Sequence, residues 1–276
     1  MNPQDPGSVR QGTYDSIQVT VAGDTVVCMV DLEPRSRRLS LWTAILTAVI
    51  AVISLGMAVT TLPHSGPYCQ SECVGYPYTD VAAFVPRDYL WIYPAVVLIL
   101  LAVVFVECLY YWIPPHGRLL SRIGVAFAIM GAAILVVDYA IQLTFIQPAL
   151  LLGETEGLSP WSQYNPHGVF IALENIGYLL LNLGFLFVGV AIVHMSSRLW
   201  RATGWIFVGA GVLTVAALVY YSAYYRVALD YRFEVASLSI AWLALIVAPV
   251  LVSIALLRAE RVKDERTASY EIAGQS

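Results

Sequence analysis

Six long apolar runs constrain this sequence more than any other feature. They lie near residues 39–62, 89–113, 121–147, 168–194, 203–225 and 235–258. A helix needs about 20 residues to cross the hydrocarbon core of a bilayer, and each run is long enough. Hydrophobic residues make up 59% of the chain and charged residues only 12%, which is too few charges for the surface of a soluble domain. The sequence therefore predicts an all-α polytopic membrane protein, a bundle of six transmembrane helices.

The arginine residues indicate how such a bundle is oriented. Basic residues occupy alternate connections and both flanks, at 35–38, 118–122, 198–201 and 258–266. The other side carries only Arg87, Arg226 and Arg232, and Asp230 and Glu234 lie beside the last two. Since positive residues favour the cytoplasmic side, we expect both termini in the cytoplasm and the protein in the cell (plasma) membrane.

Polar segments flank the transmembrane domain, which we place at 39–258. Residues 1–38 predict a cytoplasmic tail, and residues 259–276 predict a second one. Within the first tail, alternation over 16–21 and a turn at 22–24 permit a short β-hairpin at 16–30. An isolated hairpin is marginal in water, so we expect a loosely ordered tail, with the hairpin as the alternative.

Two cysteines lie four residues apart in the connection between the first two runs. Cys69 and Cys73 fall within 63–88, which the predicted orientation places outside the cell. An oxidising compartment favours a disulfide, and this spacing permits the required Cα separation of about 4.4–6.8 Å. The alternative is a metal site that also uses His64. Two sulfurs and one histidine fall short of the usual four ligands, so we expect a disulfide and no metal.

Three carboxylates, Glu107, Asp138 and Glu174, lie within the apolar runs, and no basic residue lies in the interior of any run. A charged acid at the bilayer centre costs about 2.5–3.5 kcal/mol even on insertion scales. Each acid must therefore be protonated, hydrogen-bonded or paired with a cation. Glu107 lies toward the cytoplasmic end, where we expect Arg118 or Arg122 to be its partner.

Polar groups gather on one face of the third run and one face of the fourth. On the third run, Asp138 and Gln142 continue a face of small residues at 124, 128 and 131. The polar face of the fourth run consists of His167, Glu174, Tyr178 and Asn182. Lipid cannot satisfy so many polar groups, so both faces should point into the bundle. The helical rise gives Asp138 and Glu174 similar depths, and we expect them to share a cavity that opens outward, with at least one protonated.

Two stretches resemble segments of uncharacterised six-span prokaryotic integral membrane proteins. They are Asp-Tyr-Ala-Ile-Gln at 138–142, and Ser-Gln-Tyr-Asn-Pro-His-Gly at 162–168 with Ala-Leu-Glu at 172–174. The resemblance covers mainly the third and fourth runs. It implies a multi-pass membrane protein and carries no assigned activity.

These features favour a small transporter or a solute- or cation-binding membrane protein. Its ligand would be a proton, a cation or a small molecule, held by Asp138 and Glu174 and oriented by Gln142, Tyr178 and Asn182. An accessory or assembly subunit with a structural polar core is the alternative. A membrane-embedded enzyme is less favoured, because no Gly-x-Ser-x-Gly or His-Glu-x-x-His motif appears. We expect no catalytic residue, no cofactor and no nucleic-acid partner; the partner is the lipid bilayer.

Overall fold

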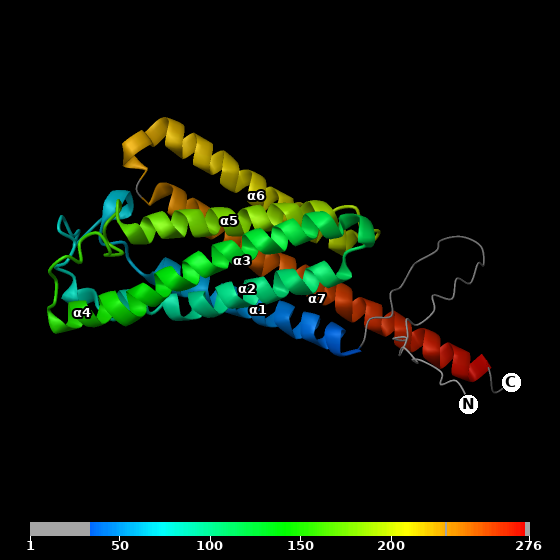
Figure 1. The fold of residues 1–276 in the computed structure, drawn as a ribbon. Helices are drawn as coiled ribbons and strands as arrows, with labels where there is room; N and C mark the ends of the chain where they lie inside the picture. The colour runs from blue at the N-terminus through cyan, green and yellow to red at the C-terminus, as the bar shows by residue number, and fades with distance from the viewer. Residues whose placement is uncertain (1–33, 230, 274–276) are drawn as a thin grey trace, which may run out of the picture. The chain divides into compact units, whose positions relative to one another are not determined.

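Helices dominate the computed structural model of the protein, which describes residues 34–229 and 231–273 (Figure 1). The alternative of a hairpin at 16–30 lies outside the described residues. The long helices are α1 (Pro34–Thr60), α2 (Ile92–Trp112), α3 (Arg118–Ile141), α5 (Val169–Ile192), α6 (Arg198–Tyr225) and α7 (Arg232–Ala273). A π-helical turn (Gln142–Ile146) joins α3 to the short α4 (Gln147–Leu152). Single 3₁₀ turns cover Gly66–Tyr68, Ala82–Phe84, Arg87–Tyr89, Pro115–Gly117 and Arg226–Ala228.

The six predicted spans are confirmed. Within the described ranges, six helices are long and apolar enough to cross a membrane. The third apolar segment runs from Pro115 to Leu152, longer than the predicted 121–147, because the helix continues through the π-helical turn into α4. No strand occurs between residues 34 and 273 where the backbone is described.

Long connections gather at one end of the bundle, at the left of Figure 1. We call this the loop end; it comprises residues 61–91, 153–168 and the α6–α7 connection. The connections at the opposite end, between α2 and α3 and between α5 and α6, are short. The loop end therefore holds most of the non-helical chain that the structure describes.

Helix α5 packs against α3, α6 and α7, and its closest neighbours approach through glycines. A Cβ atom added at Gly131 of α3 would lie 2.6 Å from the carbonyl oxygen of Gly177 in α5. One added at Gly184 of α5 would lie 2.8 Å from the carbonyl oxygen of Gly124. Small residues allow such close backbone contact in membrane bundles. The face of α3 expected to point inward is buried from Gly124 to Asp138.

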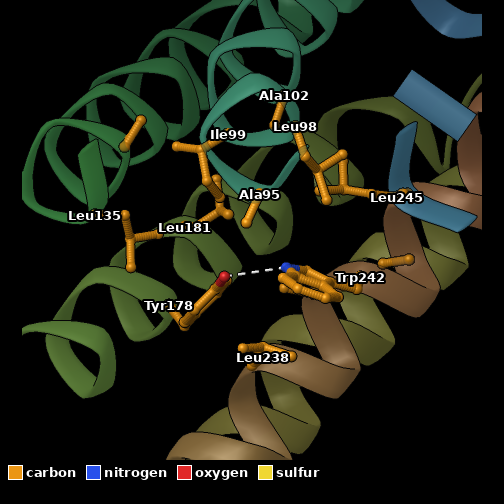
Figure 2. Close-up of a cluster of buried hydrophobic side chains, with 14 of the residues drawn as sticks. Ala95, Leu98, Ile99, Ala102, Leu135, Tyr178, Leu181, Leu238, Trp242 and Leu245 are labelled. Atoms are coloured by element: carbon orange, nitrogen blue, oxygen red, sulfur yellow. Dashed lines mark hydrogen bonds between the residues drawn. The ribbon is translucent and has the colours of Figure 1, made fainter. Parts of the chain in front are cut away.

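The interior of the bundle is filled by side chains from α2, α3, α5 and α7 (Figure 2). Trp242 of α7 is fully buried in this cluster, among the residues that include Leu98 and Leu181. Its indole group points toward the Tyr178 hydroxyl of α5, as the dashed line in Figure 2 shows. A polar contact between α5 and α7 thus lies within this cluster of hydrophobic side chains.

Candidate functional site

A cavity of about 450 Å³ lies at the loop end. Its wall is formed by the last turns of α1, the first turns of α5 and α7, and residues of the loop-end connections. The apolar part of its lining includes Leu55, Leu62, Ile171 and Leu238. The volume falls within the range of about 300–1,000 Å³ that small-molecule sites occupy.

Three acids line this cavity: Asp88, Glu174 and Glu234. All three are buried, and Glu174 is fully so. No lysine or arginine is among the lining residues. Among the described residues, every salt bridge involves Asp88. Neither Glu174 nor Glu234 is therefore paired with a basic side chain of those residues. The cavity wall therefore carries acidic groups with little compensating positive charge.

A chain of hydrogen bonds ends on Glu174, and its direction is fixed by the donors. The Trp242 Nε1–H group donates to the Tyr178 hydroxyl at 3.0 Å. The Tyr139 hydroxyl donates to Glu174 Oε1 at 2.7 Å, so the 2.7 Å bond between the two tyrosines must run from Tyr178 to Tyr139. Each hydroxyl in this chain therefore both accepts and donates. Glu174 Oε1 acts as an acceptor, and any proton on Glu174 belongs on Oε2.

The second oxygen of Glu174 is differently placed. Oε2 is buried and receives no hydrogen bond from a donor of the described residues. The side chain of Glu234, from the first turn of α7, lines the same cavity and is near enough for electrostatic interaction with Glu174. Two buried carboxylates close together repel each other unless one of them carries a proton. We call Glu174 and Glu234 the carboxyl pair.

Asp88 belongs to a separate polar cluster at the edge of the cavity. Its carboxylate lies 3.4 Å from His64 Nε2 and 3.2 Å from Arg87 Nε, and it accepts a 3.1 Å hydrogen bond from the Tyr164 hydroxyl. Burial and the neighbouring Asp88 raise the pKa of Tyr164, so this phenol stays protonated and keeps donating. The His64 ring stacks on Phe84 at a centroid distance of 3.7 Å. Asp88 is thus already compensated by groups of its own loop.

Hydrogen bonds between the loop-end connections hold the cavity wall together. The Ser65 hydroxyl lies 2.7 Å from the Tyr231 hydroxyl, which donates to the Gln163 carbonyl oxygen at 2.9 Å. Gly66 adopts a φ of +68°, and a Cβ atom there would lie 2.4 Å from the Tyr231 ring. Only glycine fits both the backbone conformation and the contact. Three segments distant in sequence are therefore fixed to one another beside the cavity.

The structure places the six predicted ligand residues in different surroundings. Glu174 lines the cavity, and the other five do not. Gln142 is buried in the π-helical turn and donates to the Trp161 carbonyl oxygen at 2.8 Å. Asn182 donates to the Tyr178 and Ser237 carbonyl oxygens, and Tyr178 belongs to the hydrogen-bond chain described above. His167 is exposed and precedes α5, so it is not on the helix face that carries Glu174.

Asp138 does not share the cavity with Glu174, contrary to the expectation. It is buried on α3, near enough for electrostatic interaction with Glu174, and its Oδ2 atom has no hydrogen-bond partner among the described residues. Successive residues of a helix point about 100° apart. The neighbouring Tyr139, rather than Asp138, contacts Glu174.

The prediction that Arg118 or Arg122 pairs with Glu107 is wrong. Glu107 is exposed on α2 and forms no salt bridge with Arg118 or Arg122. The guanidinium of Arg122 lies instead 6.0 Å from the centre of the Tyr110 ring.

At the loop end, Cys69 and Cys73 form a disulfide with a Cα separation of 5.9 Å, and His64 interacts with Asp88 rather than with the cysteines. Among the described residues, no three His, Cys, Asp or Glu side chains group to hold a metal ion.

Sequence reasoning missed most of the residues that surround Glu174. Glu234 lies at the edge of the last apolar run and was interpreted only as a counter-charge for nearby arginines. The sequence pattern does not indicate that Tyr139 contacts Glu174, and it favours an aromatic belt at the membrane interface for Trp91. In the structure Trp91 lines the cavity, and its ring packs against Tyr139 and Trp242. The signal for Glu234 was its position: an acid in the first turn of an apolar helix lies at the depth where the cavity begins.

Comparisons of the chain with protein-family models, with curated proteins and with solved structures found no match. The resemblance to six-span prokaryotic membrane proteins therefore stays a prediction. The class of protein rests on the six apolar helices, which are those of a multi-pass membrane protein.

Proposed function

We propose that this multi-pass membrane protein binds a cationic solute in the cavity, at the carboxyl pair. One observation carries the proposal: Glu174 and Glu234 both line one cavity, whose wall has no lysine or arginine. Burying acids without a counter-charge is costly, so a site of this kind favours a proton or a cation over an anion or a neutral solute.

The orientation inferred from the arginines adds a direction to this proposal. If the termini are cytoplasmic, the loop end and its cavity face the outside of the cell membrane. A solute would then reach the carboxyl pair from the extracellular side. Transport would further require a path to the opposite side, and the proposal is therefore limited to binding.

The hydrogen-bond chain supports a second candidate function, an accessory subunit with a structural polar core. Tyr139 and Tyr178 join α3 to α5, and Trp242 extends the connection to α7. Such bonds stabilise helix packing in membranes whether or not a ligand binds. The cavity beside them distinguishes the two candidates, because a structural role needs no cavity.

Cation-dependent protection from dicyclohexylcarbodiimide tests the binding proposal. This apolar reagent modifies protonated carboxyl groups, and peptide mass spectrometry locates the modified residue. Purified protein is treated with the reagent alone and with sodium, potassium, tetramethylammonium or benzyltrimethylammonium ions. At least one cation should slow the modification of Glu174 or Glu234, while exposed Glu107 serves as the internal control. If no cation protects the carboxyl pair, the structural candidate is favoured instead.

A further inference from the structure

We infer that the cation is an organic ammonium ion with an apolar body, and that it binds in exchange for one proton shared by Glu174 and Glu234. This inference rests on the proposed function and specifies its ligand class. The acids alone would not carry it. The second observation is the Glu174 side chain, which is fully buried, lines the cavity and leaves Oε2 without a donor.

The shape and lining of the cavity favour an organic ion over a small inorganic one. About 450 Å³ is far more space than a bare ion fills. The carboxyl pair lies where α5 meets α7, whereas α1 contributes apolar groups such as Leu55 and Val59. Hard inorganic cations require about six or more oxygen ligands close around them. An ammonium ion with an apolar body would place its charge at the carboxyl pair and bury its body against α1.

Aromatic rings in the wall fit the same ligand. Trp91, Tyr68 and Phe170 all line the cavity. The Trp91 ring is held in place by edge contact with Tyr139 at a centroid distance of 5.7 Å. Aromatic faces attract cations, and they do so best for weakly hydrated ones such as quaternary ammonium ions. The rings therefore provide attraction for the head group and contact area for the body.

The geometry of the carboxyl pair explains the proton exchange. Both acids line one cavity and have no basic partner among the described residues, and the repulsion between two buried carboxylates favours one proton on the pair. The protonated pair carries one negative charge. Removing the proton to water gives two negative charges, and the bound ammonium ion restores the total to one. Charge in the buried site is thus unchanged by the exchange.

Several other ionisable groups lie around the site. Tyr139 and Tyr178 are committed to the hydrogen-bond chain, and Asp138 of α3 interacts electrostatically with Glu174 but does not line the cavity. Burial raises the pKa of Tyr68 and of Tyr164, so both phenols stay protonated. The remaining groups are Asp88 with its partners His64 and Arg87, Tyr231, and Arg232, which lies over the Tyr225 ring. Glu174 and Glu234 are the two cavity-lining acids without a basic partner among the described residues, so we assign the exchanged proton to them.

The test uses equilibrium dialysis of full-length purified protein in detergent. The ligands are two radiolabelled ions, benzyltrimethylammonium and tetramethylammonium, and micelles without protein serve as the control. Both ions are permanently charged, so any pH dependence comes from the protein. Benzyltrimethylammonium should bind at least about tenfold more tightly, because it buries a phenyl ring that tetramethylammonium lacks. Its affinity should rise about tenfold per pH unit while the pair holds its proton. A pH indicator in weak buffer should record about one proton released for each ion bound.

Two matched variants locate the exchange. Glu234→Gln removes the second acid with little change in shape and should lower the affinity by about tenfold or more and abolish proton release. Glu107→Gln changes an exposed acid of α2 that does not line the cavity, and it should bind like the native protein. If Glu234→Gln fails to fold, as judged by gel filtration, the pH dependence and proton release of the native protein still decide the question.

The possible outcomes separate this inference from the proposed function. Sodium protection without benzyltrimethylammonium binding would leave the proposed function standing and overturn the ligand class. Equal affinity for the two quaternary ions would contradict the inference that the ligand has an apolar body. Binding that is independent of pH and releases no proton would reject the exchange. If no cation binds or protects, both proposals fall.

Discussion

Glu174 is the residue on which the site depends, and its two oxygens have different roles. Oε1 accepts from the Tyr139 hydroxyl, while Oε2 has no donor among the described residues. A substitution that keeps a hydrogen-bond acceptor at the position of Oε1 should therefore change the stability of the protein less than one that removes both oxygens. The same comparison separates the polar function of this side chain from its volume.

Glu174→Gln should leave stability close to that of the native protein, because the amide oxygen can accept from Tyr139 as Oε1 does. Glu174→Leu should lower it by about 1–2 kcal/mol, since the buried Tyr139 hydroxyl loses its acceptor. Thermal unfolding of the purified variants in one detergent measures both effects. Equal losses for the two variants would mean that the hydrogen bond contributes little.

Tyr139→Phe offers a second test at the residue scale, with Tyr89→Phe as its matched control. Tyr139 bonds to both Glu174 and Tyr178, whereas the equally buried Tyr89 hydroxyl has no partner among the described residues. Removing the Tyr139 hydroxyl should destabilise by about 1–2 kcal/mol, and removing the Tyr89 hydroxyl should be neutral or stabilising. Chemical denaturation midpoints report the difference. A larger loss for Tyr89→Phe would contradict the assigned hydrogen-bond chain.

At the scale of elements, α5 organises the site because it touches the helices that supply its partners. It packs against α3, which contributes Tyr139, and against α7, which contributes Glu234 and Trp242. Glycines allow the contact between α5 and α3 to be close, and α6 packs on α5 in the same way. A Cβ atom at Gly211 of α6 would lie 2.4 Å from the Cβ atom of Leu186.

Gly211→Ala and Gly209→Ala form a matched pair on α6. Gly211→Ala should destabilise the protein by about 1–3 kcal/mol, because the added methyl group overlaps α5. Gly209 has no atom within 4 Å of the added position, so Gly209→Ala should be neutral or stabilise the helix by up to about 1 kcal/mol. Thermal unfolding of both variants provides the measurement. Similar effects at the two positions would show that the α5–α6 contact is looser than the structure describes.

At the scale of the whole molecule, the orientation inferred from the arginines predicts which end of the bundle is reachable in intact cells. Thr155 is exposed at the loop end, and Ser196 is exposed in the short α5–α6 connection at the opposite end. A cysteine introduced at 155 should react with a membrane-impermeant maleimide added outside, and one at 196 should react only after the cells are opened. The reverse pattern would place the cavity on the cytoplasmic side.

The number and approximate positions of the spans could be predicted from the sequence because each depends on a local property, the length of an apolar run. The inward faces of α3 and α5 could also be predicted, since Asp138, Gln142, Glu174 and Asn182 are all buried. Helical periodicity relates these residues within a single element. It says nothing about which other element faces them.

The set of residues that line the cavity was decided by the tertiary structure alone. Glu234 joins Glu174 because the start of α7 packs beside the start of α5, a contact between residues sixty positions apart. Tyr139 rather than Asp138 meets Glu174 because the rotation of α3 about its axis depends on its glycine contacts with α5. The sequence by itself thus determined six membrane helices with buried acids. Packing decided which acids meet, because helix rotation and neighbour choice arise from contacts between distant segments.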